Sequence, residues 1–142
     1  AGEFKAVEKA IEICKGKGAK RAVLLPVSAP FHCKLLKPAG EKLAEELKKV
    51  SFNDMKIPVV TNVTAEYIND KTVVPDLLVK QVSSPVLWEK SVRKMIENGV
   101  DTFIEIGPGK VLSGFVKKIS KDVKTLNVED IDSLNKTLED LG

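Results

Sequence analysis

Short apolar runs alternate along the chain with longer stretches in which apolar residues recur every three or four positions. The first pattern is typical of buried strands and the second of amphipathic helices. The runs predict strands at 20–27, 58–63, 102–106 and 125–128. The periodic stretches predict helices at 4–15, 34–50, 111–119 and 131–141, a short helix capped by Asp76, and a helix opened by Ser84 and Pro85 that ends at Glu97. Strands that alternate with helices favour an α/β fold with parallel strands.

Composition fits a folded domain and gives no sign of a nucleic-acid partner. The chain has 142 residues, of which 43% are hydrophobic, and this is enough for a core and argues against disorder. It carries 23 basic and 20 acidic side chains, so the net charge is only +3. The lysines are interleaved with glutamates, whereas nucleic-acid binding normally gathers basic residues on one face. We expect a solvated surface and no nucleic acid.

Cysteine, histidine and hydropathy exclude several other classes of protein. The chain has two cysteines, Cys14 and Cys33, and one histidine, too few for a disulfide scaffold or a Cys/His zinc site. We therefore expect no metal. The longest apolar run, residues 22–27, is far shorter than a membrane-spanning helix. Because no signal peptide opens the chain, we expect a cytoplasmic protein without a membrane partner.

The single histidine, His32, lies in the loop at 28–33, which follows the predicted strand 20–27 and is stiffened by Pro26 and Pro30. Ligands of open α/β sheets bind at the carboxyl ends of strands, so this position suits a general base. A histidine that only packs in the fold is the alternative, and the residues alone leave both open. Cys33 next to His32 does not make a good nucleophile–base pair, because neighbouring side chains on an extended loop point in opposite directions.

A second candidate is the stretch 105–114, which contains Gly107-Pro108-Gly109 between a predicted strand and a predicted helix. Backbone N–H groups at such a turn can bind an anion. The stretch matches neither the dinucleotide fingerprint nor the P-loop pattern, so a tight structural turn is the better interpretation. No G-x-S-x-G elbow is present: Ser113 precedes Gly114, but the residue two positions before it is Val111. From the residues alone, the chain has a candidate base and no partner for it.

Three segments occur in this order in one enzyme family: Pro26–Cys33 (PVSAPFHC), Gln81–Trp88 (QVSSPVLW) and Glu105–Leu112 (EIGPGKVL). On these segments the chain resembles the malonyl-CoA:acyl carrier protein transacylases of bacterial fatty-acid synthesis, and more distantly the acyltransferase domains of polyketide and fatty-acid synthases. The likeness covers essentially the whole chain, which looks like the C-terminal portion of such an enzyme.

The resemblance implies an α/β-hydrolase-like acyltransferase core with a small ferredoxin-like subdomain. Residues 1–28 look like the C-terminal part of that subdomain, and 29–142 like the C-terminal part of the core. His32 matches the general base of the family, and Gln81 the position whose main-chain carbonyl orients that base in place of the usual acid. The nucleophilic serine and the arginine that pairs with the malonyl carboxylate both belong upstream, outside this chain.

The reaction implied is a ping-pong transfer of malonyl from coenzyme A to the phosphopantetheine thiol of acyl carrier protein. Its substrates are malonyl-CoA and the carrier protein, no further cofactor is needed, and the N-terminal portion of the same enzyme is a partner. Two other hypotheses for the function stay open: a non-catalytic α/β folding or binding module, and a small independent hydrolase that uses Cys33.

Overall fold

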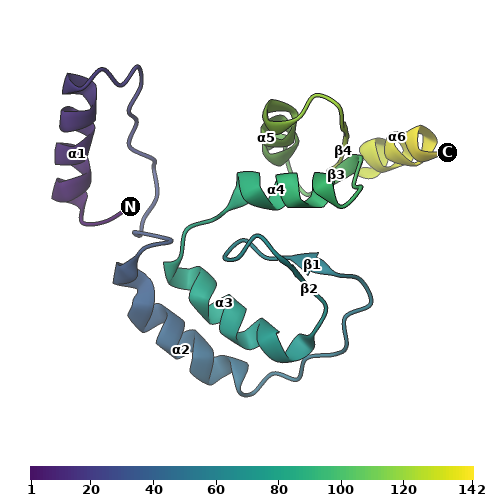
Figure 1. The fold of residues 1–142 in the computed structure, drawn as a ribbon, viewed down its shortest axis with the longest axis horizontal. Helices are drawn as coiled ribbons and strands as arrows, with labels where there is room; N and C mark the ends of the chain where they lie inside the picture. Colours follow the sequence, from purple (N-terminus) through teal and green to yellow (C-terminus); the bar gives the residue numbers. More distant parts are fainter. The chain divides into compact units, whose positions relative to one another are not determined.

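The computed structural model describes all 142 residues, which form two compact units, 1–86 and 87–142 (Figure 1). The units mix helices with two small sheets, so the predicted α/β class is confirmed at that level. The subdomain boundary expected after residue 28 rests on the resemblance and stays a prediction. None of the helices is both long and apolar enough to cross a membrane.

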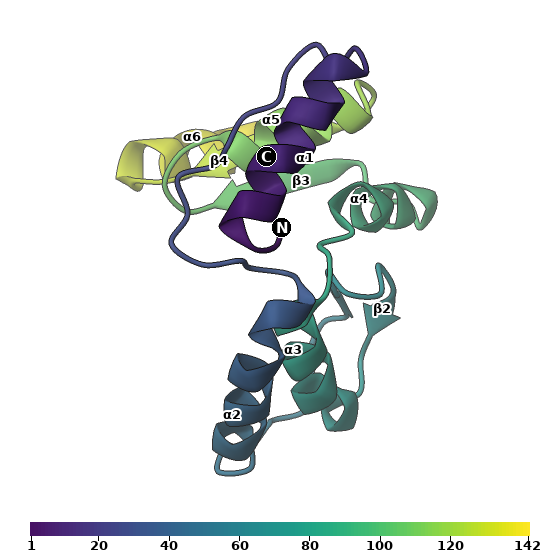
Figure 2. The ribbon, with the colours of Figure 1, turned by 90° about the vertical axis from the view of Figure 1, so that its left-hand side faces the viewer.

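The first unit is built mainly on two helices that pack side by side, α2 and α3 (Figure 1, Figure 2). Gly40 of α2 is buried there, and a β-carbon in its place would lie 3.3 Å from the carbonyl oxygen of Val79 in α3. The missing side chain thus lets the two backbones approach closely. The elements of this unit are α1 (Phe4–Gly16), η1 (Lys34–Leu36), α2 (Lys37–Leu47), β1 (Val59–Val60), β2 (Tyr67–Ile68), η2 (Lys71–Val73) and α3 (Val74–Ser83).

The second unit contains one strand–helix–strand motif, which is followed by the C-terminal helix. Its elements are α4 (Trp88–Glu97), β3 (Thr102–Ile106), α5 (Val111–Ile119), β4 (Lys124–Val128) and α6 (Ile131–Leu141). β3 and β4 pair in parallel, with Thr102 opposite Lys124 and Ile106 opposite Val128. α5 contacts both strands, and α6 contacts β4. The predicted parallel pairing is confirmed, and so are the predicted elements from residue 102 onward.

The predicted strand at 20–27 is wrong. The structure gives this segment no regular secondary structure, and the only two sheets pair β1 with β2 and β3 with β4. A strand depends on hydrogen bonds to a neighbour, and no segment of this chain supplies one. Its apolar side chains are exposed as a result, including Val23 (57%), Leu25 (68%) and Val27 (59%).

Three other expectations also need correction. The helix that Ser84 and Pro85 were expected to open begins only at Trp88, because Ser84 instead terminates α3 in an extended conformation. Asp76 lies within the first turn of α3 and does not cap it, and α3 has no side-chain cap. Asp70 caps η2 instead, where its side chain accepts a hydrogen bond from the N–H of Thr72. The strand at 58–63 shrinks to the two residues of β1.

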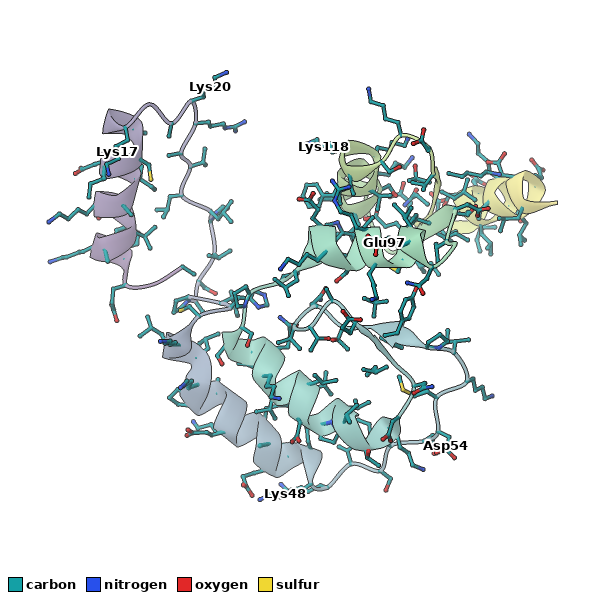
Figure 3. All side chains as sticks on the ribbon, in the orientation of Figure 1. Lys17, Lys20, Lys48, Asp54, Glu97 and Lys118 are labelled. Carbon is teal, nitrogen blue, oxygen red and sulfur yellow. The ribbon has the colours of Figure 1, made fainter.

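Few apolar side chains are enclosed. The buried hydrophobic residues are Ala65, Val92 and Val116, and α1 buries none (Figure 3 shows its side chains). Ile106 in β3 is 82% exposed and Ile131 in α6 is 72% exposed. Where exposed apolar side chains form a contiguous patch, the patch normally marks a region that another protein covers.

We therefore expect the isolated 142-residue chain to associate in solution. Sedimentation velocity should show species that grow with protein concentration, and added salt should not dissociate them because the exposed groups are apolar. A compact monomer that unfolds cooperatively at every concentration would contradict this expectation.

Candidate functional site

His32 lies in an exposed turn between the irregular segment that follows α1 and the short helix η1. Its φ of 59° is in the left-handed region, where Ala65 is the only other non-glycine residue of this chain. Histidine is among the residues that tolerate this region better than most, but the conformation is uncommon. Uncommon backbone conformations gather at functional sites, so His32 remains the leading candidate on structural grounds as well.

The imidazole of His32 reaches across 49 residues of sequence to Gln81 in the last turn of α3. Its Nδ1 atom lies 3.3 Å from the Gln81 main-chain carbonyl oxygen and 3.4 Å from the side-chain Nε2 of the same residue. A proton on Nδ1 satisfies the carbonyl and leaves Nε2 of the ring with a free lone pair. That tautomer is the one a general base needs, and the carbonyl favours it, whereas the Gln81 amide at 3.4 Å is a donor and can bond only to an unprotonated Nδ1.

The Gln81 carbonyl is free to accept a hydrogen bond from the imidazole because of Pro85. In a continuing helix the N–H four residues ahead would bond to it, and Pro85, at that position, has no N–H. Within the chain's backbone, the carbonyl receives only a long bond of 3.4 Å from the N–H of Ser84. The helix end thus offers an acceptor to the ring.

Cys33 does not pair with His32. Its Sγ donates a hydrogen bond to the Pro30 carbonyl oxygen at 3.1 Å, and the residue is half-buried. No hydrogen bond joins the thiol to the imidazole, so the geometry gives a Cys33 nucleophile no support.

The turn at 107–109 has a structural role, because the chain's own side chains bind its backbone N–H groups and those of the helix that follows. Glu105 in β3 accepts the N–H groups of Ser113 at 2.8 Å and Leu112 at 3.1 Å, and the N–H of Gly109 donates to Glu129 at 2.9 Å. The chain's own carboxylates therefore occupy the amides that could have bound an anion at the start of α5. The hydrogen bond from the Ser113 N–H is the main reason that the pKa of Glu105 is lowered.

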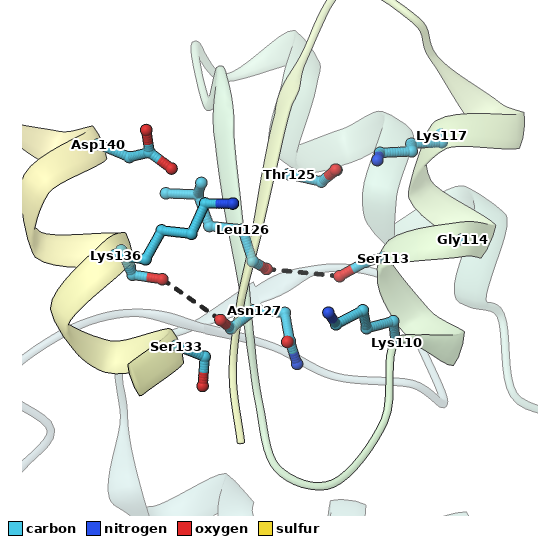
Figure 4. Close-up of a pocket in the computed structure, with 11 residues that line it drawn as sticks. Lys110, Ser113, Gly114, Lys117, Thr125, Leu126, Asn127, Ser133, Lys136 and Asp140 are labelled. Carbon is cyan, nitrogen blue, oxygen red and sulfur yellow. Dashed lines mark hydrogen bonds between the residues drawn. The ribbon is translucent and has the colours of Figure 1, made fainter. Parts of the chain in front are cut away.

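A cavity of about 390 Å³ lies between α5, β4 and α6 in the second unit (Figure 4). Three lysines line it, Lys110, Lys117 and Lys136, and of these only Lys110 has an acidic partner, Glu129, at 3.8 Å. Hydrogen bonds from Ser113 to the Leu126 carbonyl and from Thr137 to the Asn127 carbonyl hold the two helices to β4. Sequence reasoning missed this cavity because its lysines are spread over 27 positions of a lysine-rich chain.

Nowhere in the chain do three His, Cys, Asp or Glu side chains gather as a metal site requires.

The chain is similar in sequence to proteins of known family. No family model matches the chain. The malonyl CoA-acyl carrier protein transacylase of Bacillus subtilis is 47% identical over 141 residues, which cover 99% of this chain and 44% of that protein. The Escherichia coli K12 protein of the same name is 50% identical over 119 residues, which cover 84% of this chain and 38% of that protein.

Solved structures extend the agreement to the fold. The transacylase from Clostridium perfringens superimposes with a TM-score of 0.93 at 56% identity, over 99% of this chain and 44% of that one. The chain matches the C-terminal part of the malonyl CoA-acyl carrier protein transacylases. A malonyl-transacylase solved in complex with a type II PKS acyl-carrier protein also superimposes, with a TM-score of 0.93 at 42% identity, over 98% of this chain and 45% of that one. The resemblance stated from the sequence is confirmed, and the chain spans less than half the length of these transacylases.

The structure brings together the two site residues that the resemblance named, His32 and Gln81. Their roles in catalysis are not tested by this proximity and stay predictions. The local signal that sequence reasoning overlooked is Pro85, which marks in advance the helix carbonyl that will be left without a partner.

Replacement of Glu105 by Gln should loosen the start of α5, because an amide oxygen accepts these N–H groups less strongly than a carboxylate. The lowered pKa means that the stabilisation is present above the ordinary pKa of a glutamate and is lost as the pH falls through the lowered value. Hydrogen exchange in peptides covering 107–116 should therefore be faster in E105Q at neutral pH, and the difference should vanish in acid once intrinsic rates are corrected. The exposed Glu139→Gln is the control, and equal exchange in E105Q and wild type at neutral pH would contradict the assignment.

Proposed function

We propose that this chain is the C-terminal portion of a malonyl-CoA:acyl carrier protein transacylase and that His32 is its general base. The observation that carries the proposal is the contact of 3.3 Å between His32 Nδ1 and the Gln81 carbonyl oxygen, in a chain similar to transacylases over nearly its whole length. The roles of both residues are inferred from that contact and from the family resemblance.

In the proposed reaction the nucleophile is a serine supplied by the N-terminal portion of the enzyme. The Nε2 atom of His32 takes the proton of the serine hydroxyl as the oxygen attacks the thioester carbonyl of malonyl-CoA. The imidazolium then returns the proton to the departing thiolate of coenzyme A, which leaves a malonyl–serine ester. The phosphopantetheine thiol of acyl carrier protein gives its proton to the same nitrogen and attacks the ester, and the imidazolium passes that proton to the departing serine oxygen, which regenerates the serine.

Gln81 has the positioning role in this mechanism. Its carbonyl oxygen accepts a hydrogen bond from the Nδ1–H of His32, fixes the ring orientation and leaves Nε2 of the neutral ring as the atom that takes the serine proton. The proposed reaction needs neither a metal nor a further cofactor, since malonyl-CoA and the phosphopantetheinylated carrier protein are substrates. The cytoplasm is the proposed place of action.

The fold proposed for the whole enzyme is an α/β-hydrolase-like core with a ferredoxin-like subdomain, divided in this chain after residue 28. The parallel pair β3 and β4, joined by α5, is consistent with part of such a core. Exposed apolar groups on 20–27 and on β3 support a partner that covers them, and the N-terminal portion of the same enzyme is the proposed one.

Replacing His32 by Ala in the full-length enzyme should lower the rate of serine acylation by about 10²–10⁴-fold, the usual effect of removing a general base. Rapid-quench measurement of malonyl transfer from radiolabelled malonyl-CoA gives the rate, and circular dichroism checks the fold. Lys34→Ala, on an exposed neighbouring residue, is the matched control. A His32→Ala enzyme with the wild-type rate would favour the non-catalytic module instead.

The 142 residues alone should not become labelled by malonyl-CoA, since they lack the activated serine that forms the ester. Labelling should appear when the N-terminal portion, expressed separately, is added. Stable malonyl transfer to Cys33 or to any serine of the isolated chain would overturn the assignment.

A further inference from the structure

The backbone of His32 adopts an unfavourable conformation in its turn. Residues 30–33 reverse the chain, and His32, at the third position, has a φ of 59°. Turns with positive φ at this position normally use glycine or asparagine, because a β-carbon crowds the backbone there. Something in the surroundings has to compensate for a histidine at this point.

The thiol of Cys33 supplies a bond across this turn. Its Sγ donates to the carbonyl oxygen of Pro30 at 3.1 Å, a short distance for a sulfur donor. Pro30 and Cys33 are the two ends of the turn, so the bond spans the left-handed residue between them. The side chain is half-buried, and this limits competition by water.

Cys33 also connects the turn to the element that follows. It is the residue before η1, with an extended backbone, and its carbonyl accepts the N–H of Leu36 at 3.0 Å. On the other side, the N–H of Phe31 bonds to the Ala29 carbonyl at 2.9 Å. The loop is therefore held at both ends, and the thiol bond is the side-chain link directly across His32.

We propose that Cys33 is a positioning residue: its thiol bond to the Pro30 carbonyl holds His32 in the left-handed conformation that keeps the imidazole on the Gln81 carbonyl. The inference rests on the proposed role of His32 as the base. It gives Cys33 no covalent step, because the thiol donates its hydrogen bond to the Pro30 carbonyl and no hydrogen bond joins it to the imidazole of His32. The group that matters is the donor, so a serine hydroxyl should replace it, while alanine and valine should not.

The test compares Cys33→Ser, Cys33→Ala and Cys33→Val in the full-length enzyme. Cys14→Ala, which removes the other free thiol from an exposed position on α1, is the matched control. We expect Cys33→Ala and Cys33→Val to lower kcat for malonyl transfer about threefold to tenfold, the range that loss of one hydrogen bond allows. KM for malonyl-CoA should not change, Cys33→Ser should stay within about twofold of wild type, and Cys14→Ala should match it.

Each other outcome counts against the inference. Equal loss in Cys33→Ser and Cys33→Ala would mean that sulfur packing matters and not the donor. A wild-type kcat in Cys33→Ala would mean that the turn needs no such bond. A raised KM together with a lowered melting temperature would indicate general loosening of the loop. If His32→Ala is inactive and the Cys33 variants are normal, only the role of Cys33 fails; if His32→Ala is active, the proposed function itself fails.

Discussion

The contact between the His32 ring and the Gln81 carbonyl depends on where one helix stops. α3 ends at Ser83, and Pro85 cannot supply the N–H that would have used the Gln81 carbonyl. The close packing of α2 against α3 around Gly40 fixes that helix end relative to the segment that leads from the His32 turn into α2. A proline, a glycine and a strained turn, none of them chemically reactive, thus bring a ring nitrogen and a carbonyl together across 49 positions.

In the second unit, too, the backbone groups at helix ends determine how the helices are held. The N-terminus of α5 has unpaired N–H groups, and Glu105, in the preceding strand, accepts two of them. Asp130 does the same for α6 by accepting the N–H of Ser133, whose hydroxyl accepts from the Asp130 N–H in return. Both helices are therefore fixed to the ends of β3 and β4 by local hydrogen bonds, although little apolar surface is enclosed around them.

Local periodicity was enough to predict the elements from residue 102 onward, because strand, turn and helix there are adjacent in sequence and pair with one another. It failed at 20–27, where the apolar run is suited to a strand but no strand of this chain pairs with it. It also failed at Ser84 and Pro85, which fit a helix start by residue type but are used to end the preceding helix. The pairing of His32 with Gln81 came from the family resemblance; only afterwards does Pro85 explain why that carbonyl, and not an earlier one in α3, is the acceptor.

A neutral carbonyl in place of the usual carboxylate raises the question of what supports the ring while it holds a proton. In the proposed reaction the imidazole becomes positive for as long as the serine oxygen is attacking. The Gln81 carbonyl belongs to the last turn of α3, a helix of 10 residues, where unpaired carbonyls carry the negative end of the helix dipole. That end is equivalent to about half a negative charge, and its effect is confined to the last turn, which is where Gln81 lies. The helix terminus can thus perform part of the electrostatic work of an acid at Nδ1, while the proton taken from the serine is held on Nε2 for return to the leaving thiolate.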